Sequence, residues 1–197
     1  MAFLNRIRKY FPVTGSLTPA VWLLFSALLL PSLSHAQEQD HAAEYKIKAA
    51  YLYKFCDYVE WPKAAFPSPD SPLVIGVLGA DDLATDLEQI AVGRDINGRS
   101  ITVKRLQPGD PINGMQVLFI GRSAEADLAA TLDAAQTQSI LTVTEQDDDG
   151  TLESIINFIV SDDRVRFDVK LDSARRNNLQ ISSRLLSVAR RVREGTS

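Results

Sequence analysis

Short apolar runs alternate with segments of helical periodicity between residues 73 and 143, and this alternation limits the chain to few folds. Continuous apolar runs at residues 73–78, 116–120 and 140–143 are typical of strands covered on both faces, and residues 101–106 alternate as a strand does. Helical spacing predicts helices at residues 81–91 and 124–135, the second capped by Ser123. Strands that alternate with helices predict an α/β fold.

The C-terminal part follows a different pattern. Residues 155–160 and 165–169 flank Asp162-Asp163 and are predicted to pair as an antiparallel hairpin. Ser182 and Ser183 are predicted to cap the start of a closing helix, whose apolar stripe is Ile181, Leu185, Val188 and Val192. We therefore predict a mixed, mostly parallel β-sheet flanked by helices, a Rossmann-like sandwich without a nucleotide motif that closes with a β-hairpin and a C-terminal helix.

The first 36 residues have the three parts of a secretory signal peptide. Basic residues at positions 6, 8 and 9 precede the apolar run at residues 21–30 and the small residues around His35. The uninterrupted run is about half of the roughly 20 residues that span a membrane, so we expect cleavage after Ala36 and no stable membrane insertion. The prediction is a cleaved signal peptide (1–36), a flexible N-terminus (37–43) and a single domain (44–193), located in the periplasm.

Cleavage would leave an acidic protein. The leader holds three basic residues and no acid, so the remainder has 18 basic and 25 acidic residues and a formal charge of −7, against −4 for the whole chain. An acidic chain is poorly suited to neutralise phosphates, and nucleic acid is therefore not an expected partner.

Histidine and cysteine are too scarce for the commonest catalytic and metal sites. The histidines are His35, in the leader, and His41, in the predicted loose terminus, so we expect neither a catalytic histidine nor a zinc site. Cys56 is the single cysteine and excludes an intramolecular disulfide; we predict a buried, inert thiol, with an intermolecular disulfide as the alternative. The chain is predicted to be no enzyme and to need no cofactor.

Two weak motifs have ordinary explanations. Gly76 and Gly79 end a strand before a helix, as a phosphate-binding turn would, but the glycine triplet is missing. Glu145, followed by acids and Gly150, resembles the start of a calcium loop whose required final acid would be Ile156. We interpret the first as a tight strand exit and the second as a solvated acidic turn.

Residues 44–60 are predicted to form the first helix of the domain. Its inward stripe is Ile47, Tyr51, Phe55 and Tyr58, and Trp61-Pro62 ends it. Trp61 is either a lid on the core or an anchor for a partner, and the lid is favoured because large aromatic side chains are mostly buried.

Arg164 and Arg166 are the predicted partner- or ligand-binding residues. They share one face of a strand, opposite the predicted core residue Phe167. A solvated face explains them, but two guanidinium groups on one face also suit a carboxylate or another anion.

Two segments together resemble the YfiR family of periplasmic proteins. The first is Tyr51-Leu52, Phe55 and Glu60-Trp61-Pro62 in the first helix. The second is the C-terminal block, with Asn157-Phe158, Arg166-Phe167, Leu171-Asp172, Ala174-Arg175, Ile181-Ser182-Ser183 and Leu185-Leu186. Residues 118–120 and 140–143 stand between them in the expected order, so the resemblance covers about residues 44–192.

The resemblance implies a compact α/β regulator rather than an enzyme. Such a protein would bind the periplasmic sensor part of an inner-membrane diguanylate cyclase and hold it inactive, which lowers cyclic di-GMP and biofilm formation. An outer-membrane lipoprotein able to sequester it, and a homodimer, are the further partners implied. The alternative function is a periplasmic binding protein for a small anion or amino acid near Arg164 and Arg166.

The sequence departs from the family pattern in three places. Glu153 and Ser154 stand where relatives often have two glycines, and Lys170 where many have Asn. The paired cysteines of some relatives are missing, so redox control by disulfides is not expected here.

Overall fold

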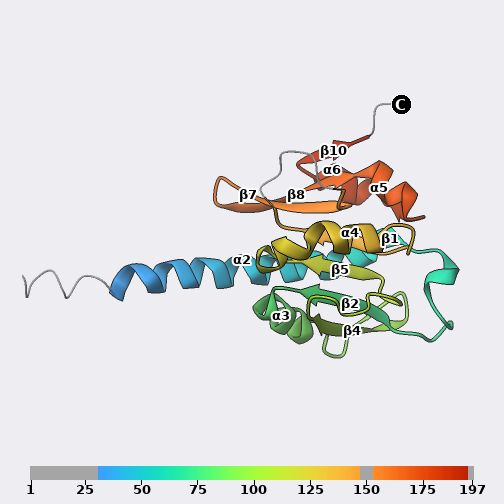
Figure 1. The fold of residues 1–197 in the computed structure, drawn as a ribbon, viewed down its shortest axis with the longest axis horizontal. Coiled ribbons are helices and arrows are strands. Elements are labelled where there is room, and N and C mark those ends of the chain that lie inside the picture. The colour runs from blue at the N-terminus through green and yellow to red at the C-terminus, as the bar shows by residue number, and fades with distance from the viewer. Residues whose placement is uncertain (1–30, 147–152, 195–197) are drawn as a thin grey trace, which may run out of the picture. The chain divides into compact units, whose positions relative to one another are not determined.

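The computed structural model describes residues 31–146 and 153–194 (Figure 1). Most of the predicted signal peptide and the acidic turn at residues 147–150 lie outside this part. A compact unit begins at Asp40 and contains every strand of the described chain.

The unit is built on an eight-stranded sheet with the order β10-β8-β7-β6-β5-β2-β4-β3. The strands are β2 (Leu73–Leu78), β3 (Asp95–Ile96), β4 (Arg99–Leu106), β5 (Val117–Ile120), β6 (Leu141–Thr144), β7 (Ile156–Ser161), β8 (Arg164–Lys170) and β10 (Arg191–Arg193). The strands β4, β2, β5, β6 and β7 are parallel neighbours, and β7 turns back antiparallel into β8. The predicted fold class, a mixed and mostly parallel α/β sheet with a closing hairpin, is confirmed.

Helices cover both faces of this sheet. On one face α2 (Pro31–Tyr58) and α3 (Asp81–Ala91) pack in a large core cluster, which includes Phe55 of α2, Phe158 and the predicted core residue Phe167. On the other face α4 (Leu128–Ala135) packs in a smaller cluster with Leu118 and Ile120 of β5. In Figure 1 α4 lies in front of the sheet, and the part of α2 that belongs to the compact unit lies behind it.

Two tight turns consist of residue types that suit their backbone conformation, and the first of them, at Asp162-Asp163, was predicted. Asp162 and Asp163, which join β7 to β8, both have positive φ (53° and 56°), as do Asn97 (53°) and Gly98 (76°), which join β3 to β4. Positive φ at both central residues is the geometry of a two-residue hairpin turn, and Asn, Asp and Gly accept it at the lowest cost.

The predicted closing helix is confirmed as α6 (Ser183–Val188), which buries Leu185, but the helix is shorter than its predicted apolar stripe. The Ser182 hydroxyl accepts a bond from the Arg184 N–H at 3.3 Å, but α6 ends early and Val188 is 65% exposed. Ile181 belongs to β9 (Gln180–Ile181), which pairs with β1 (Val59–Glu60), and Val192 to β10. Backbone pairing with β1 and β8 therefore overrides the helical spacing. A further helix, α5 (Leu171–Arg176), was not predicted.

Helix α2 differs from its prediction in start and in rotation. It begins at Pro31 and runs through residues 37–43, for which no regular structure was expected. Its buried face includes Tyr45, Lys48 and Leu52, whereas Ile47, predicted to point inward, is 48% exposed. The cause is the buried polar cluster described below, which draws Lys48 to the inside.

Ser123 does not cap a helix as predicted. It lies in the 3-10 segment η2 (Arg122–Asp127) that precedes α4, and its hydroxyl donates to the Gly79 carbonyl at 2.6 Å. This bond ties the loop after β5 to the loop after β2. A second 3-10 segment, η1 (Lys63–Ala65), lies in the connector between Trp61 and β2, which contains Pro62, Pro67, Pro69 and Pro72.

Candidate functional site

Arg164 and Arg166 lie on β8, exposed, on the sheet face opposite α2. Their register partners on β7 are Ser161 and Ile159, whereas Phe158 and Phe167 of the same hairpin point to the α2 side. Neither guanidinium makes a hydrogen bond or ion pair with another residue of the described ranges 31–146 and 153–194. Since no described residue pairs with these two charges, they are available to a partner.

The same face continues with Asp168, which is 4% exposed. Its carboxylate accepts two bonds from Arg190, from Nε at 2.8 Å and Nη2 at 2.6 Å, and Arg193 lies 3.9 Å away. The register of β10 places further basic residues beside β8, Arg191 next to Asp168 and Arg193 next to Lys170. We call the face formed by Arg164, Arg166, Lys170, Arg191 and Arg193 the basic strand face.

Trp61 is not part of this face. Its half-buried indole packs against the core cluster on the α2 side, and its Nε1 donates to the Gln116 carbonyl at 3.0 Å. Gln116 in turn accepts from the Val74 N–H at 2.8 Å and donates to the Ala65 carbonyl at 2.7 Å, which fixes the connector to the sheet. The geometry agrees with the favoured lid interpretation and does not bring Trp61 together with the two arginines.

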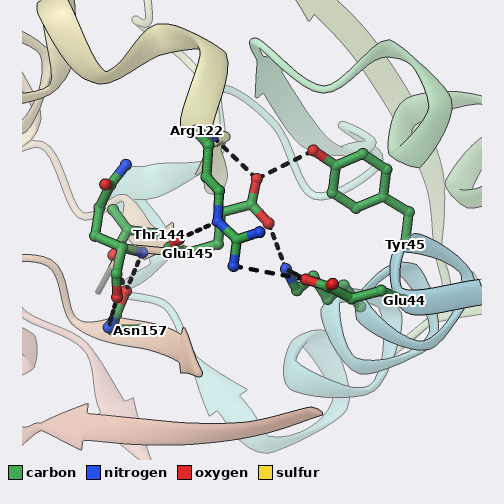
Figure 2. A network of polar contacts seen from close by, with 8 residues as sticks. Glu44, Tyr45, Arg122, Thr144, Glu145 and Asn157 are labelled. Atoms are coloured by element: carbon green, nitrogen blue, oxygen red, sulfur yellow. Dashed lines mark hydrogen bonds and ion pairs between the residues drawn. The ribbon is translucent and has the colours of Figure 1, made fainter. Parts of the chain in front are cut away.

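A densely bonded polar cluster surrounds Glu145, whose predicted place is a solvated acidic turn (Figure 2). That assignment is wrong for Glu145, which directly follows β6 and is fully buried. Its Oε1 accepts from the Tyr45 hydroxyl at 3.2 Å and from the Arg122 N–H at 3.0 Å, and its Oε2 pairs with Lys48. Three elements, α2, η2 and the end of β6, therefore meet at one carboxylate.

Lys48 is the cationic member of this cluster and is also fully buried. Its ammonium pairs with Glu145 and with Glu44 one turn earlier on α2, and lies 5.9 Å from the centre of the Phe158 ring. Arg122 closes the outer side, with Nε donating to the Glu145 carbonyl at 3.2 Å and Nη2 lying 3.8 Å from Glu44. A buried ion pair needs such additional bonds to offset the loss of hydration.

Tyr45 and Cys56 show how closed this side of α2 is. Burial, followed by the charge of Glu145 and the hydrogen bond to it, raises the pKa of the Tyr45 phenol far above its ordinary value. Burial likewise raises the pKa of the Cys56 thiol, whose Sγ donates to the Leu52 carbonyl at 3.3 Å. The prediction of a buried, unreactive thiol is confirmed in its burial.

A cavity of about 420 Å³ lies beside Tyr45, at the carboxyl ends of the parallel strands β2 and β4. The strands β4 and β5 lie on opposite sides of β2, so the strand order reverses here. Open α/β sheets bind ligands outside the carboxyl ends of the strands at such a switch point. Asp81, Asp82, Gln107 and Ser123 provide its polar lining, and none of its lining residues is basic. Neither Arg164 nor Arg166 lines it.

Gly79 and Gly121 allow the loops that follow β2 and β5 to pack closely against each other. A Cβ on Gly121 would lie 2.4 Å from the Gly79 carbonyl oxygen, and one on Gly79 would lie 2.9 Å from the Ala124 backbone nitrogen. The loops after β2 and β5 therefore touch directly, which leaves no room for a pyrophosphate between them. The interpretation of Gly79 as a tight strand exit agrees with this geometry.

Within the described residues, no three His, Cys, Asp or Glu side chains are grouped as metal ligands. The helices of that part of the chain are all too short or too polar to cross a bilayer.

The fold and the site together define a class: a doubly wound α/β domain with an acidic cavity at its switch point, a buried ion-pair cluster and an outward basic strand face. The chain belongs to the YfiR/HmsC-like family, whose model matches residues 45–190. Membership agrees with a regulatory rather than a catalytic role. Comparison with curated proteins found no match.

Proposed function

We propose that this protein is a periplasmic, non-enzymatic regulator that binds the periplasmic sensor part of an inner-membrane diguanylate cyclase and holds the enzyme inactive. Cyclic di-GMP and biofilm formation fall as a result. An outer-membrane lipoprotein that sequesters the regulator, and a homodimer as its working form, belong to the same proposal. The observation that carries it is membership of the YfiR/HmsC-like family over nearly the whole domain.

The predicted signal peptide supports the location. A basic start, an apolar run and small residues before position 37 direct export, and a periplasmic protein can reach the outer part of an inner-membrane enzyme. Cleavage after Ala36 would also remove the first residues of α2.

The basic strand face supports protein binding. Arg164 and Arg166 project from a sheet face that neither core cluster reaches at these positions. Arginine is enriched in the energetically important centres of interfaces. One reason is that its planar guanidinium group can donate two parallel hydrogen bonds to one carboxylate. We therefore assign the contact with an acidic region of the cyclase to these two residues.

The test is a binding titration with the purified sensor part of the cyclase. The double variant Arg164→Ala/Arg166→Ala should bind at least tenfold more weakly, which corresponds to about 1.4 kcal/mol. Arg184→Ala, an exposed arginine on α6, is the matched control and should bind as the wild type does. Equal affinity of the double variant would remove Arg164 and Arg166 from the interface.

A second candidate function is the binding of a small molecule, supported by the cavity beside Tyr45. Its acidic lining, without a basic residue, disfavours an anion, so a cationic amine or an amino acid with a basic side chain fits better. A thermal-shift screen of amines and amino acids tests this, and a stabilising hit should be lost in Asp81→Asn/Asp82→Asn. A screen without hits would remove the candidate.

A further inference from the structure

A groove of about 470 Å³ runs between the start of the compact unit in α2 and the tip of the β7–β8 hairpin. Its floor is apolar and comes from segments far apart in the sequence: Ala43 and Ile47 of α2, Val160 of β7 and Val165 of β8. Ile47 (48% exposed) and Val160 (44% exposed) are two of five strongly exposed large apolar side chains in the described part of the chain. Because these side chains lie together, they form an apolar surface whose exposure to water is unfavourable in free energy.

Three acids surround this floor: Asp40 and Glu44 on α2 and Asp163 in the hairpin turn. None of the residues that line the groove is basic. Glu44 is partly neutralised by Lys48, whereas Asp40 and Asp163 make no ion pair with another residue of the described ranges. Arg164 and Arg166 do not offset these charges from within the groove, because they lie on the opposite face of the hairpin.

We propose that this groove binds a segment of the regulated partner that presents aliphatic side chains flanked by lysine or arginine. The inference rests on the proposed function for the partner's identity, but its chemistry follows from the groove itself. An apolar stripe buries the exposed faces of Ile47 and Val160, and basic flanks complement Asp40 and Asp163. The partner would then contact both faces of the hairpin, with the basic strand face on one side and this acidic groove on the other.

The charges favour this occupant over two others. An anionic membrane surface would be repelled by the acidic rim. A second copy placed groove to groove would bring the acids of both copies together, and like charges disfavour such a contact.

The first test uses the purified protein and two synthetic amphipathic peptides with the same leucine stripe, one flanked by lysines and one by glutamates. Fluorescence anisotropy should show binding of the lysine peptide at least tenfold tighter than of the glutamate peptide. Val160→Arg should weaken binding of the lysine peptide about tenfold or more. The double variant Asp40→Asn/Asp163→Asn should weaken it several-fold at low salt and less at high salt.

The chain offers matched controls. Val188, on α6, is 65% exposed and does not line the groove, so Val188→Arg introduces the same charge elsewhere and should bind the lysine peptide normally. Asparagine suits position 163 because it also accepts a positive φ, so the turn is kept while the charge is removed. Equal binding of both peptides, or equal losses in Val160→Arg and Val188→Arg, would overturn the proposal. A change of oligomeric mass in Val160→Arg would assign the groove to a second copy and overturn it as well.

The second test separates this inference from the proposed function. In cells that contain the partner cyclase, Val160→Arg should raise cyclic di-GMP toward the level of a deletion, and Val188→Arg should not. If the wild-type protein lowers cyclic di-GMP and Val160→Arg does so equally well, the groove is not a contact for the cyclase and the inference fails. If the wild-type protein itself has no effect, the proposed function fails, while the peptide assay still decides the chemistry of the groove.

Discussion

Lys48 and Glu145 form an ion pair between two fully buried side chains that are 97 positions apart in the sequence. The pair joins the second half of α2 to the carboxyl end of β6, beside the cavity edge of the sheet. It is a buried, long-range polar constraint on how α2 lies across the sheet.

Removing one partner of this pair should be costly. Lys48→Met leaves the Glu145 carboxylate buried without its ammonium, and we expect a loss of about 3–5 kcal/mol in the free energy of unfolding. Urea denaturation measures it. The double variant Lys48→Met/Glu145→Gln removes both charges and should recover part of that loss. A single variant within about 1 kcal/mol of the wild type would show that the pair contributes little.

Tyr45 should make the protein sensitive to alkali. The raised pKa of its phenol means that the folded state keeps a proton that the unfolded state releases above about pH 10. Stability is therefore unaffected by this group below that pH and falls as the pH rises from there toward the folded-state pKa. Tyr45→Phe loses one hydrogen bond, about 1 kcal/mol at neutral pH, and should flatten the alkaline fall. Denaturation series of both proteins at increasing pH test this; parallel curves would contradict it.

Gly121 should not tolerate a methyl group. Its φ of −79° suits any residue, so the cost of Gly121→Ala is purely steric, from a Cβ placed 2.4 Å from the Gly79 carbonyl oxygen. The two loops would have to separate, and we expect a loss of about 2–3 kcal/mol in thermal or urea unfolding. Gly76→Ala is the comparison, because the nearest atom to its Cβ is the flexible Met115 sulfur. A larger loss at Gly76 would contradict this account.

Two arginines near β8 should behave differently. Arg166→Ala changes an exposed side chain without a partner among the described residues and should alter stability by no more than about 0.5 kcal/mol. Arg190→Ala leaves the buried Asp168 without its paired bonds and should cost about 2–4 kcal/mol. Unfolding caused by Arg166→Ala would make that side chain structural and end its role as a contact.

Periodicity and turn chemistry were enough to predict six of the eight strands of the sheet, all but β3 and β10. The spans of β2 and α3 agree with their predicted ranges, because continuous apolar runs and a regular amphipathic helix carry local signals. The hairpin was also predictable, since Asp162 and Asp163 suit its turn.

The rest depended on contacts between distant residues. Glu44 and Lys48 have the spacing of an ordinary surface pair, and only the fold shows that Glu145 draws Lys48 inward and leaves Ile47 outside. The C-terminal stripe failed for a similar reason, because β9 and β10 gain backbone bonds from β1 and β8 that no local pattern shows. The roles of Arg164, Arg166 and Trp61 in binding stay predictions.

The most direct test of the regulatory role is the level of cyclic di-GMP in cells that contain the partner cyclase and lack this protein. We predict that deletion raises this level, that wild-type protein restores it, and that Arg164→Ala/Arg166→Ala restores it incompletely while accumulating normally. An unchanged level of cyclic di-GMP after deletion, in cells shown to contain the cyclase, would contradict it.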